Sequence, residues 1–97
     1  MIVRILGEGQ FRVDDDAAAK LTALDKDLDA AVRDDEDAVF RASLRAAVAL
    51  VKASGTPLSA DEIATADFIL PFSDASLDEV RKLLADGTIS GDSIGLP

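Results

Sequence analysis

Apolar and polar residues alternate regularly over the first thirteen positions of the chain. Ile2 to Leu6 and Gln10 to Val13 are rich in β-branched and aromatic residues, and Gly7-Glu8-Gly9 separates the two runs. Such residues fit a pleated, half-buried surface, and short glycine-containing loops join antiparallel strands. The pattern therefore predicts a β-hairpin whose loop is formed by the three residues Gly7 to Gly9.

The predicted register decides which side chains share a face. A three-residue loop pairs Leu6 with Gln10, and successive side chains of a strand point to opposite faces. Four apolar residues then face the core: Val3, Ile5, Phe11 and Val13. The same register places Arg4 directly opposite Arg12 on the outer face, where like charges cost stability unless an anionic group lies between them. That group is either Glu8 or another carboxylate of this fold, or a carboxylate of a partner.

A phosphate-binding loop is the alternative interpretation of the two glycines. A dinucleotide-binding fingerprint needs a third glycine at position 12 and a helix directly after it. The chain has Arg12 there, and a predicted strand follows the loop. The glycines therefore indicate a hairpin turn.

The period of the apolar residues changes to three and four after Val13. Asp14-Asp15-Asp16 is a favourable helix start, and the predicted first helix extends to about Arg33. The second helix is predicted from about Asp37 to Ser54, where Gly55 stops it. The apolar positions of the first helix are Ala17, Leu21, Leu24, Leu28 and Ala31 or Val32, and those of the second are Phe40, Leu44, Ala47, Val48 and Val51. The two should form an antiparallel αα-hairpin.

The last third of the chain combines short elements. Thr56-Pro57-Leu58 is predicted to be a connector, and Ser59 to Glu62 has the capping-box spacing of a short helical turn. Phe68-Ile69-Leu70 reads as a brief strand, which Pro71 either confines to a sheet edge or ends. A second capping box, Ser76 to Glu79, opens a helix that continues to Asp86.

These elements predict an α+β fold. The small antiparallel sheet consists of the N-terminal β-hairpin and the Phe68–Leu70 strand, and the αα-hairpin and the C-terminal helix cover one of its faces. Residues 1–87 are expected to form a single domain, and residues 88–97, with Gly91 and Gly95, a flexible C-terminal tail. A chain of 97 residues has room for one modest core and not for two.

Composition narrows the class of partner. The formal net charge of −9 opposes binding to nucleic acid or anionic lipid, which attract an excess of Lys and Arg. The longest charge-free apolar run, around Ala46 to Val51, is far shorter than the roughly 20 residues of a membrane span. Arg4, Glu8 and Arg12 interrupt the N-terminus, so no secretory signal is recognised and a cytoplasmic location is expected. The expected partners are proteins.

The side chains that usually carry catalysis are missing. The chain has no histidine, cysteine or tyrosine, so its serines have no imidazole to activate them and zinc has none of its preferred nitrogen or sulfur ligands. Paired carboxylates are abundant, but they stand at helix starts and turns, where capping and solubility explain them. The sequence therefore predicts neither an enzyme nor a cofactor.

A calcium-binding loop is the sharpest alternative to a purely structural interpretation. The segment from Asp25 to Glu36 carries residues that an EF-hand loop accepts at its positions 1, 3, 5, 8 and 12. The sixth position needs glycine for a sharp turn and holds Ala30, and the helical apolar pattern continues through the segment. A solvated helix face is the favoured interpretation.

Two groups of basic residues are candidates for partner binding. Arg4 and Arg12 form the first group, on the outer face of the hairpin. Arg41, Arg45 and Lys52 form the second, because they fall within about 40° of one line on the second helix. Such a strip is most often a solvated face paired with neighbouring acids. The partner-binding hypothesis therefore names Arg4, Arg12, Arg41 and Arg45.

Several stretches together resemble one family. They are MIVRILGEGQFRV, the two-helix segment that closes in Gly55-Thr56-Pro57-Leu58, Ala66 to Pro71, and Asp74 to Val80. Over these stretches, the chain is similar to the phage-shock-protein-A-associated family of small bacterial and archaeal proteins. The similarity extends from Met1 to about Leu84, and Thr88 to Pro97 has no counterpart in it.

The resemblance implies a cytoplasmic, non-enzymatic accessory of the membrane-stress response. It would act by protein–protein interaction with phage shock protein A, a coiled-coil protein that coats the inner membrane, and would reach the membrane face through that partner. No catalytic residues follow from the resemblance. A homo-oligomer is also possible, and the alternative function is a calcium- or small-ligand-binding regulatory domain.

Overall fold

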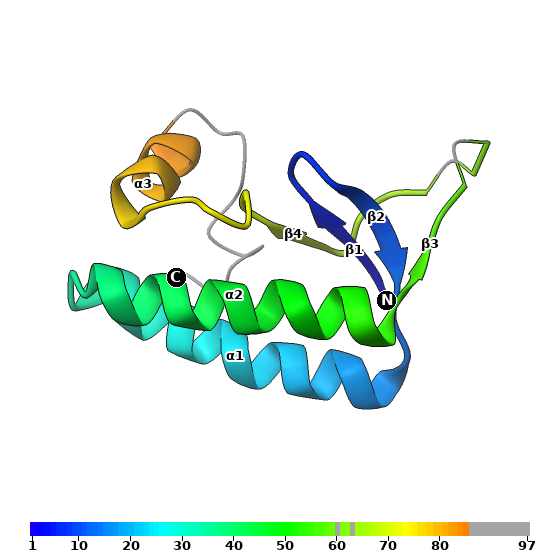
Figure 1. Ribbon diagram of the computed structural model, residues 1–97, viewed down its shortest axis with the longest axis horizontal. Helices are drawn as coiled ribbons and strands as arrows, with labels where there is room; N and C mark the ends of the chain where they lie inside the picture. The colour runs from blue at the N-terminus through cyan, green and yellow to red at the C-terminus, as the bar shows by residue number, and fades with distance from the viewer. Residues whose placement is uncertain (60, 63, 86–97) are drawn as a thin grey trace.

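The computed structural model describes residues 1–59, 61–62 and 64–85. Two layers make up this part of the chain (Figure 1): helices α1 and α2 lie side by side in one layer, and a four-stranded sheet and helix α3 form the other. The elements, in chain order, are β1 (Ile2–Ile5), β2 (Gly9–Arg12), α1 (Asp15–Arg33), α2 (Asp37–Ser54), β3 (Thr56–Pro57), β4 (Phe68–Leu70) and α3 (Leu77–Ala85). The predicted α+β class is confirmed.

The two long helices begin and end where the sequence predicts. The Ala17 amide donates to Asp14 Oδ1 over 2.9 Å, which caps the start of α1. The turn between the helices contains Asp35 at φ 58°, and α2 ends at Ser54 with Gly55 as its C-cap. The αα-hairpin is therefore confirmed. α1 is one continuous helix through the Asp25–Arg33 segment, which confirms the helical interpretation that the sequence favoured over a calcium-binding loop.

The core lies between the two layers. The core-facing residues of the hairpin, Val3, Ile5 and Val13, are 0–4% exposed, while Phe11 is half-buried. From α2, all five predicted apolar positions are buried: Phe40, Leu44, Ala47, Val48 and Val51. From α1, Ala17, Leu21, Leu28 and Ala31 are buried, and Leu24 and Val32 are partly buried. The helical periodicity thus identified the core face of both helices.

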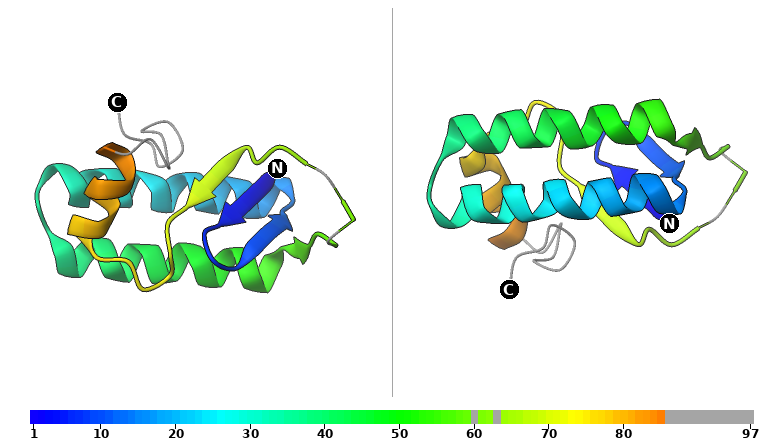
Figure 2. Two further views of the ribbon diagram at one scale, coloured as in Figure 1. Left: turned by 90° about the horizontal axis from the view of Figure 1, so that it is seen from above. Right: turned by 90° about the horizontal axis from the view of Figure 1, so that it is seen from below.

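The sheet is mixed, whereas the sequence predicted a purely antiparallel one. Its strand order is β3-β2-β1-β4, and β4 runs parallel to β1. The segment between β3 and β4 carries the chain from one edge of the sheet to the other, so β4 enters in the same direction as β1 (Figure 2). Thr56-Pro57 was expected to be a connector, but it pairs with Phe11 and Arg12 as the edge strand β3.

The hairpin register differs from the prediction by two residues. Arg4 lies opposite Gln10, and Arg12 lies opposite Ile2. The Glu8 amide donates to the Ile5 carbonyl over 2.9 Å, and both Gly7 and Gly9 have positive φ, so the turn closes one residue earlier. A shift of two preserves the faces of the strands, but Arg4 and Arg12 are diagonal neighbours and not a directly opposed pair.

Helix α3 lies beside the sheet, on the same side of the αα-hairpin (Figures 1 and 2). The sequence placed it over the sheet. Two contacts hold it near the α1–α2 turn: the Leu77 amide donates to Asp37 Oδ1 over 2.9 Å, and Arg81 Nη1 lies 2.8 Å from Asp35 Oδ1. Within the described residues, no helix covers the outer face of the sheet. The predicted tail, residues 88–97, lies outside the described residues.

Candidate functional site

The outer face of the sheet carries the first two candidate residues. Strand alternation directs Arg4 and Arg12 away from the helical layer, and both are exposed. Beside Arg4, the neighbouring strands contribute Gln10 from β2 and Ile69 from β4, which are its partners in the register. The structure therefore brings Arg4 and Arg12 onto one surface, as the sequence predicts.

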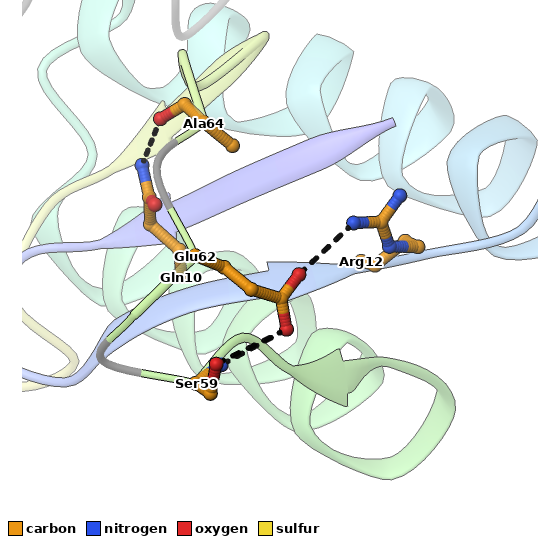
Figure 3. A network of polar contacts seen from close by, with 5 residues as sticks. All are labelled: Gln10, Arg12, Ser59, Glu62 and Ala64. Carbon is orange, nitrogen blue, oxygen red and sulfur yellow. Dashed lines mark hydrogen bonds and ion pairs between the residues drawn. The ribbon is translucent and has the colours of Figure 1, made fainter.

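The segment that follows β3 folds back against this surface. Arg12 Nη2 lies 3.4 Å from Glu62 Oε2, and Gln10 Nε2 donates to the Ala64 carbonyl over 3.2 Å (Figure 3). Glu62 Oε1 in turn accepts the Ser59 amide over 3.2 Å. The Ser59–Glu62 capping box thus forms a turn, with Glu62 reaching back to the Ser59 amide.

The acid that neutralises Arg12 belongs to this fold. Glu62 is that acid, which is one of the two sources that the sequence left open. Glu8, the acid named for this role, forms an ion pair with Lys52 of α2 instead. Arg12 therefore holds the β3–β4 segment on the sheet, and it is not a free cation.

A shallow pocket of about 390 Å³ opens beside this network. Its lining residues are Arg4, Gly9, Gln10, Leu58, Ser59, Glu62 and Ala64. Arg4 forms no ion pair with any acid among the described residues, whereas Arg12 on the same face is paired. The pocket therefore presents one arginine without an ion pair in the described part of the chain, one carboxylate and several half-buried groups.

The basic strip of α2 is a second, separate surface in the helical layer. Arg41 Nε lies 2.9 Å from Asp37 Oδ2, and Lys52 is paired with Glu8. Arg45 is exposed and has no ion pair among the described residues. Two of the three cations thus neutralise this domain's own acids, which the sequence interpretation of a solvated face predicts.

Asp37 is a structural residue that the sequence did not single out. It starts α2, and its carboxylate accepts both the Leu77 amide and Arg41 Nε over 2.9 Å. The hydrogen bond from the Leu77 amide and the charge of Arg41 lower the pKa of Asp37. Because its partner lies 40 residues away, no local motif reveals this contact.

We expect Asp37→Ala to loosen α3 and to lower the melting temperature at neutral pH, whereas Asp37→Asn retains an acceptor for Leu77 and has a smaller effect. A lowered pKa means that this contribution is present above the unfolded-state value of 3.8 and is lost as the pH falls through the folded-state pKa. Amide exchange at Leu77, measured at neutral pH and near pH 3, tests this. Equal protection in Asp37→Ala and the wild type would contradict it.

The segment weighed as a calcium loop contains a buried acid, Asp25, next to a half-buried one, Asp29. Asp25 is 9% exposed, and Asp29, one turn later, forms an ion pair with Arg33 over 3.3 Å. Neither Asp25 Oδ1 nor Asp29 Oδ1 has a hydrogen-bond partner among the described residues. Burial and the neighbouring Asp29 charge raise the pKa of Asp25 to about 6.

Comparison with known proteins matches most of the chain to one family. The family model described as PspA-Associated protein matches residues 1–92. The search of curated proteins found no match, and neither did the search of solved structures. None of the helices in the described part of the chain is both long enough and apolar enough to span a membrane.

Proposed function

Since this chain belongs to the family of PspA-associated proteins, we propose that it is a non-enzymatic accessory protein that binds phage shock protein A. The family match over residues 1–92 is the observation that carries the proposal. The formal net charge of −9 also favours a protein partner over nucleic acid or an anionic membrane. The proposed role is regulation of the membrane-stress response in the cytoplasm through this contact.

The surface chemistry supports binding over catalysis. The pocket on the outer sheet face is lined by an exposed arginine, an amide, a carboxylate and small or apolar residues. The chain has no histidine or cysteine to serve as a general base, a nucleophile or a zinc ligand. A sheet face that no helix of the described residues covers, with polar groups along one side, is suited to hold another protein segment.

The experiment titrates purified phage shock protein A with the full 97-residue chain and measures the heat of binding by calorimetry. We expect saturable binding between the two proteins in the absence of lipid. A maltose-binding-protein titration at the same concentrations is the control for nonspecific association. If phage shock protein A binds no better than this control, the proposed function is wrong.

The same proposal predicts how the chain reaches a membrane. Because its net charge is negative, it should not sediment with anionic lipid vesicles by itself. It should sediment with them once phage shock protein A is bound to the vesicles. Sedimentation to the same extent with and without phage shock protein A would contradict recruitment through the partner.

A further inference from the structure

The side of β1 and β4 that faces away from the helices carries apolar residues on both sides of Arg4. The outward positions of β1 are Ile2 and Arg4, and the outward position of β4 is Ile69, which is the partner of Arg4 in the register. Ile2 and Ile69 are half-buried, and Arg4 is exposed. A sheet face in water normally carries polar residues at these positions, so this face has the composition of a surface that receives a partner.

The pocket adjoins this surface and gives it a concave region beside Arg4. Leu58 and Ala64 of the β3–β4 segment form half-buried walls next to Arg4, and Gly9 leaves its own position open, because no atom lies within 4 Å of where a side chain would begin. Arg12 and Gln10 hold that segment in place through Glu62 and Ala64 (Figure 3). The wall of the pocket is thus fastened to the sheet before any partner arrives, which reduces the entropy lost on binding.

The charged residues around the pocket indicate which chemical group of a partner it binds. Arg12 is neutralised by Glu62, while Arg4 has no acidic partner among the described residues. A guanidinium presents donors in a fork that matches a carboxylate, and the half-buried apolar neighbours lower the exposure of such a pair to water. Glu62 lines the same pocket and disfavours a multiply charged anion such as phosphate.

We propose that the surface formed by Ile2, Arg4 and Ile69 and the adjoining pocket is the docking site for phage shock protein A, and that Arg4 binds an Asp or Glu side chain of that partner which is flanked by apolar residues. This inference rests on the proposed function. A second copy of this chain is the less favoured occupant, because each copy carries a net charge of −9.

The test measures binding of phage shock protein A to the wild type, Arg4→Ala, Arg4→Lys and Arg45→Ala. Arg45→Ala tests the competing surface on α2, because Arg45 is the other candidate arginine that is exposed and has no ion pair among the described residues. We expect Arg4→Ala to weaken binding about 10- to 100-fold, as loss of a central arginine does in other interfaces. Arg4→Lys retains the positive charge but lacks the two-pronged guanidinium donors, so its affinity should be intermediate. Arg45→Ala should bind as the wild type does.

Two further readouts separate the outcomes. Wild-type affinity should fall as salt rises, and that of Arg4→Ala should fall less, because one charge pair has been removed. Melting temperatures establish that each variant is folded; Arg4 is exposed, so they should be unchanged.

Each failure has a distinct meaning. If the wild type binds and Arg4→Ala binds equally well, the docking site is wrong and the proposed function stands. If Arg45→Ala loses binding instead, docking takes place on α2 and the inference is overturned. If the wild type does not bind phage shock protein A, both the inference and the proposed function are overturned. If sedimentation shows a dimer that Arg4→Ala abolishes, the occupant is a second copy and the inference is also wrong.

Discussion

Replacing Gly55 with alanine should destabilise the domain by about 2–4 kcal/mol. A Cβ atom at this position would lie 2.5 Å from the Val51 carbonyl oxygen, which already accepts the Gly55 amide over 2.7 Å. It would also lie 3.1 Å from Phe11 Cβ and 3.2 Å from a methyl group of Val13. Because two of these contacts involve backbone or the first side-chain carbon, no rotamer change relieves them, and the end of α2 must move away from β2.

Gly9→Ala is the matched control for this prediction. Gly9 has φ 101° and no atom within 4 Å of the added Cβ, so its substitution costs only backbone strain, about 1–2 kcal/mol. Gly55 has an ordinary φ of −90°, so its cost comes from the close approach alone. Chemical denaturation of both variants separates the two causes. A Gly55→Ala variant as stable as the wild type would contradict the contact between the α2 end and β2.

Asp25→Asn should stabilise the domain at pH 7 to 8 by about 1–2 kcal/mol. Burial and the charge of Asp29 raise the pKa of Asp25 from 3.8 to about 6, so its ionised form is disfavoured in the folded state. That difference converts to about 3 kcal/mol at about 1.36 kcal/mol per pKa unit, and relaxation of water and protein around the charge reduces it. The amide of Asn can also donate toward the Asp29 Oδ1 atom, which has no hydrogen-bond partner among the described residues.

The pH dependence follows from the direction of the shift. A pKa raised on folding contributes stability below the unfolded value of 3.8, and this contribution is lost as the pH rises through about 6. The wild type should therefore lose stability relative to Asp25→Asn between about pH 4 and pH 6, and the two should converge at lower pH. Melting temperatures across this range give the measurement.

Asp27→Asn provides the comparison for this substitution. Asp27 is exposed on the same helix, so Asp27→Asn should change the free energy of unfolding by less than about 0.5 kcal/mol across the same pH range. Equal gains from the two substitutions would mean that reduced net charge, and not the burial of Asp25, is responsible. No gain from Asp25→Asn at pH 7 would contradict the disfavoured charge.

The local sequence alone determined the helices, the hairpin strands, β4 and the buried faces of these elements, but not the short edge strand β3. The three- and four-residue spacing of apolar positions identified the core side of α1 and α2, and Asp14 and Gly55 identified the start of the first helix and the end of the second. Strand alternation placed Arg4 and Arg12 on the outer face even though the register was wrong, because a shift of two residues does not exchange the faces.

Only the tertiary structure decided how these elements join. The turn conformation selected the Arg4–Gln10 register, and the path of the chain from β3 to β4 made the sheet mixed. Arg12 finds its acid in Glu62, 50 residues later, and Asp37 holds the first amide of α3 from 40 residues away. Capping, turns and periodicity depend on neighbours along the chain and can be predicted from them. Partners distant in sequence depend on the path of the whole chain, so only the folded molecule shows that Arg12 is engaged and that Arg4 faces the pocket.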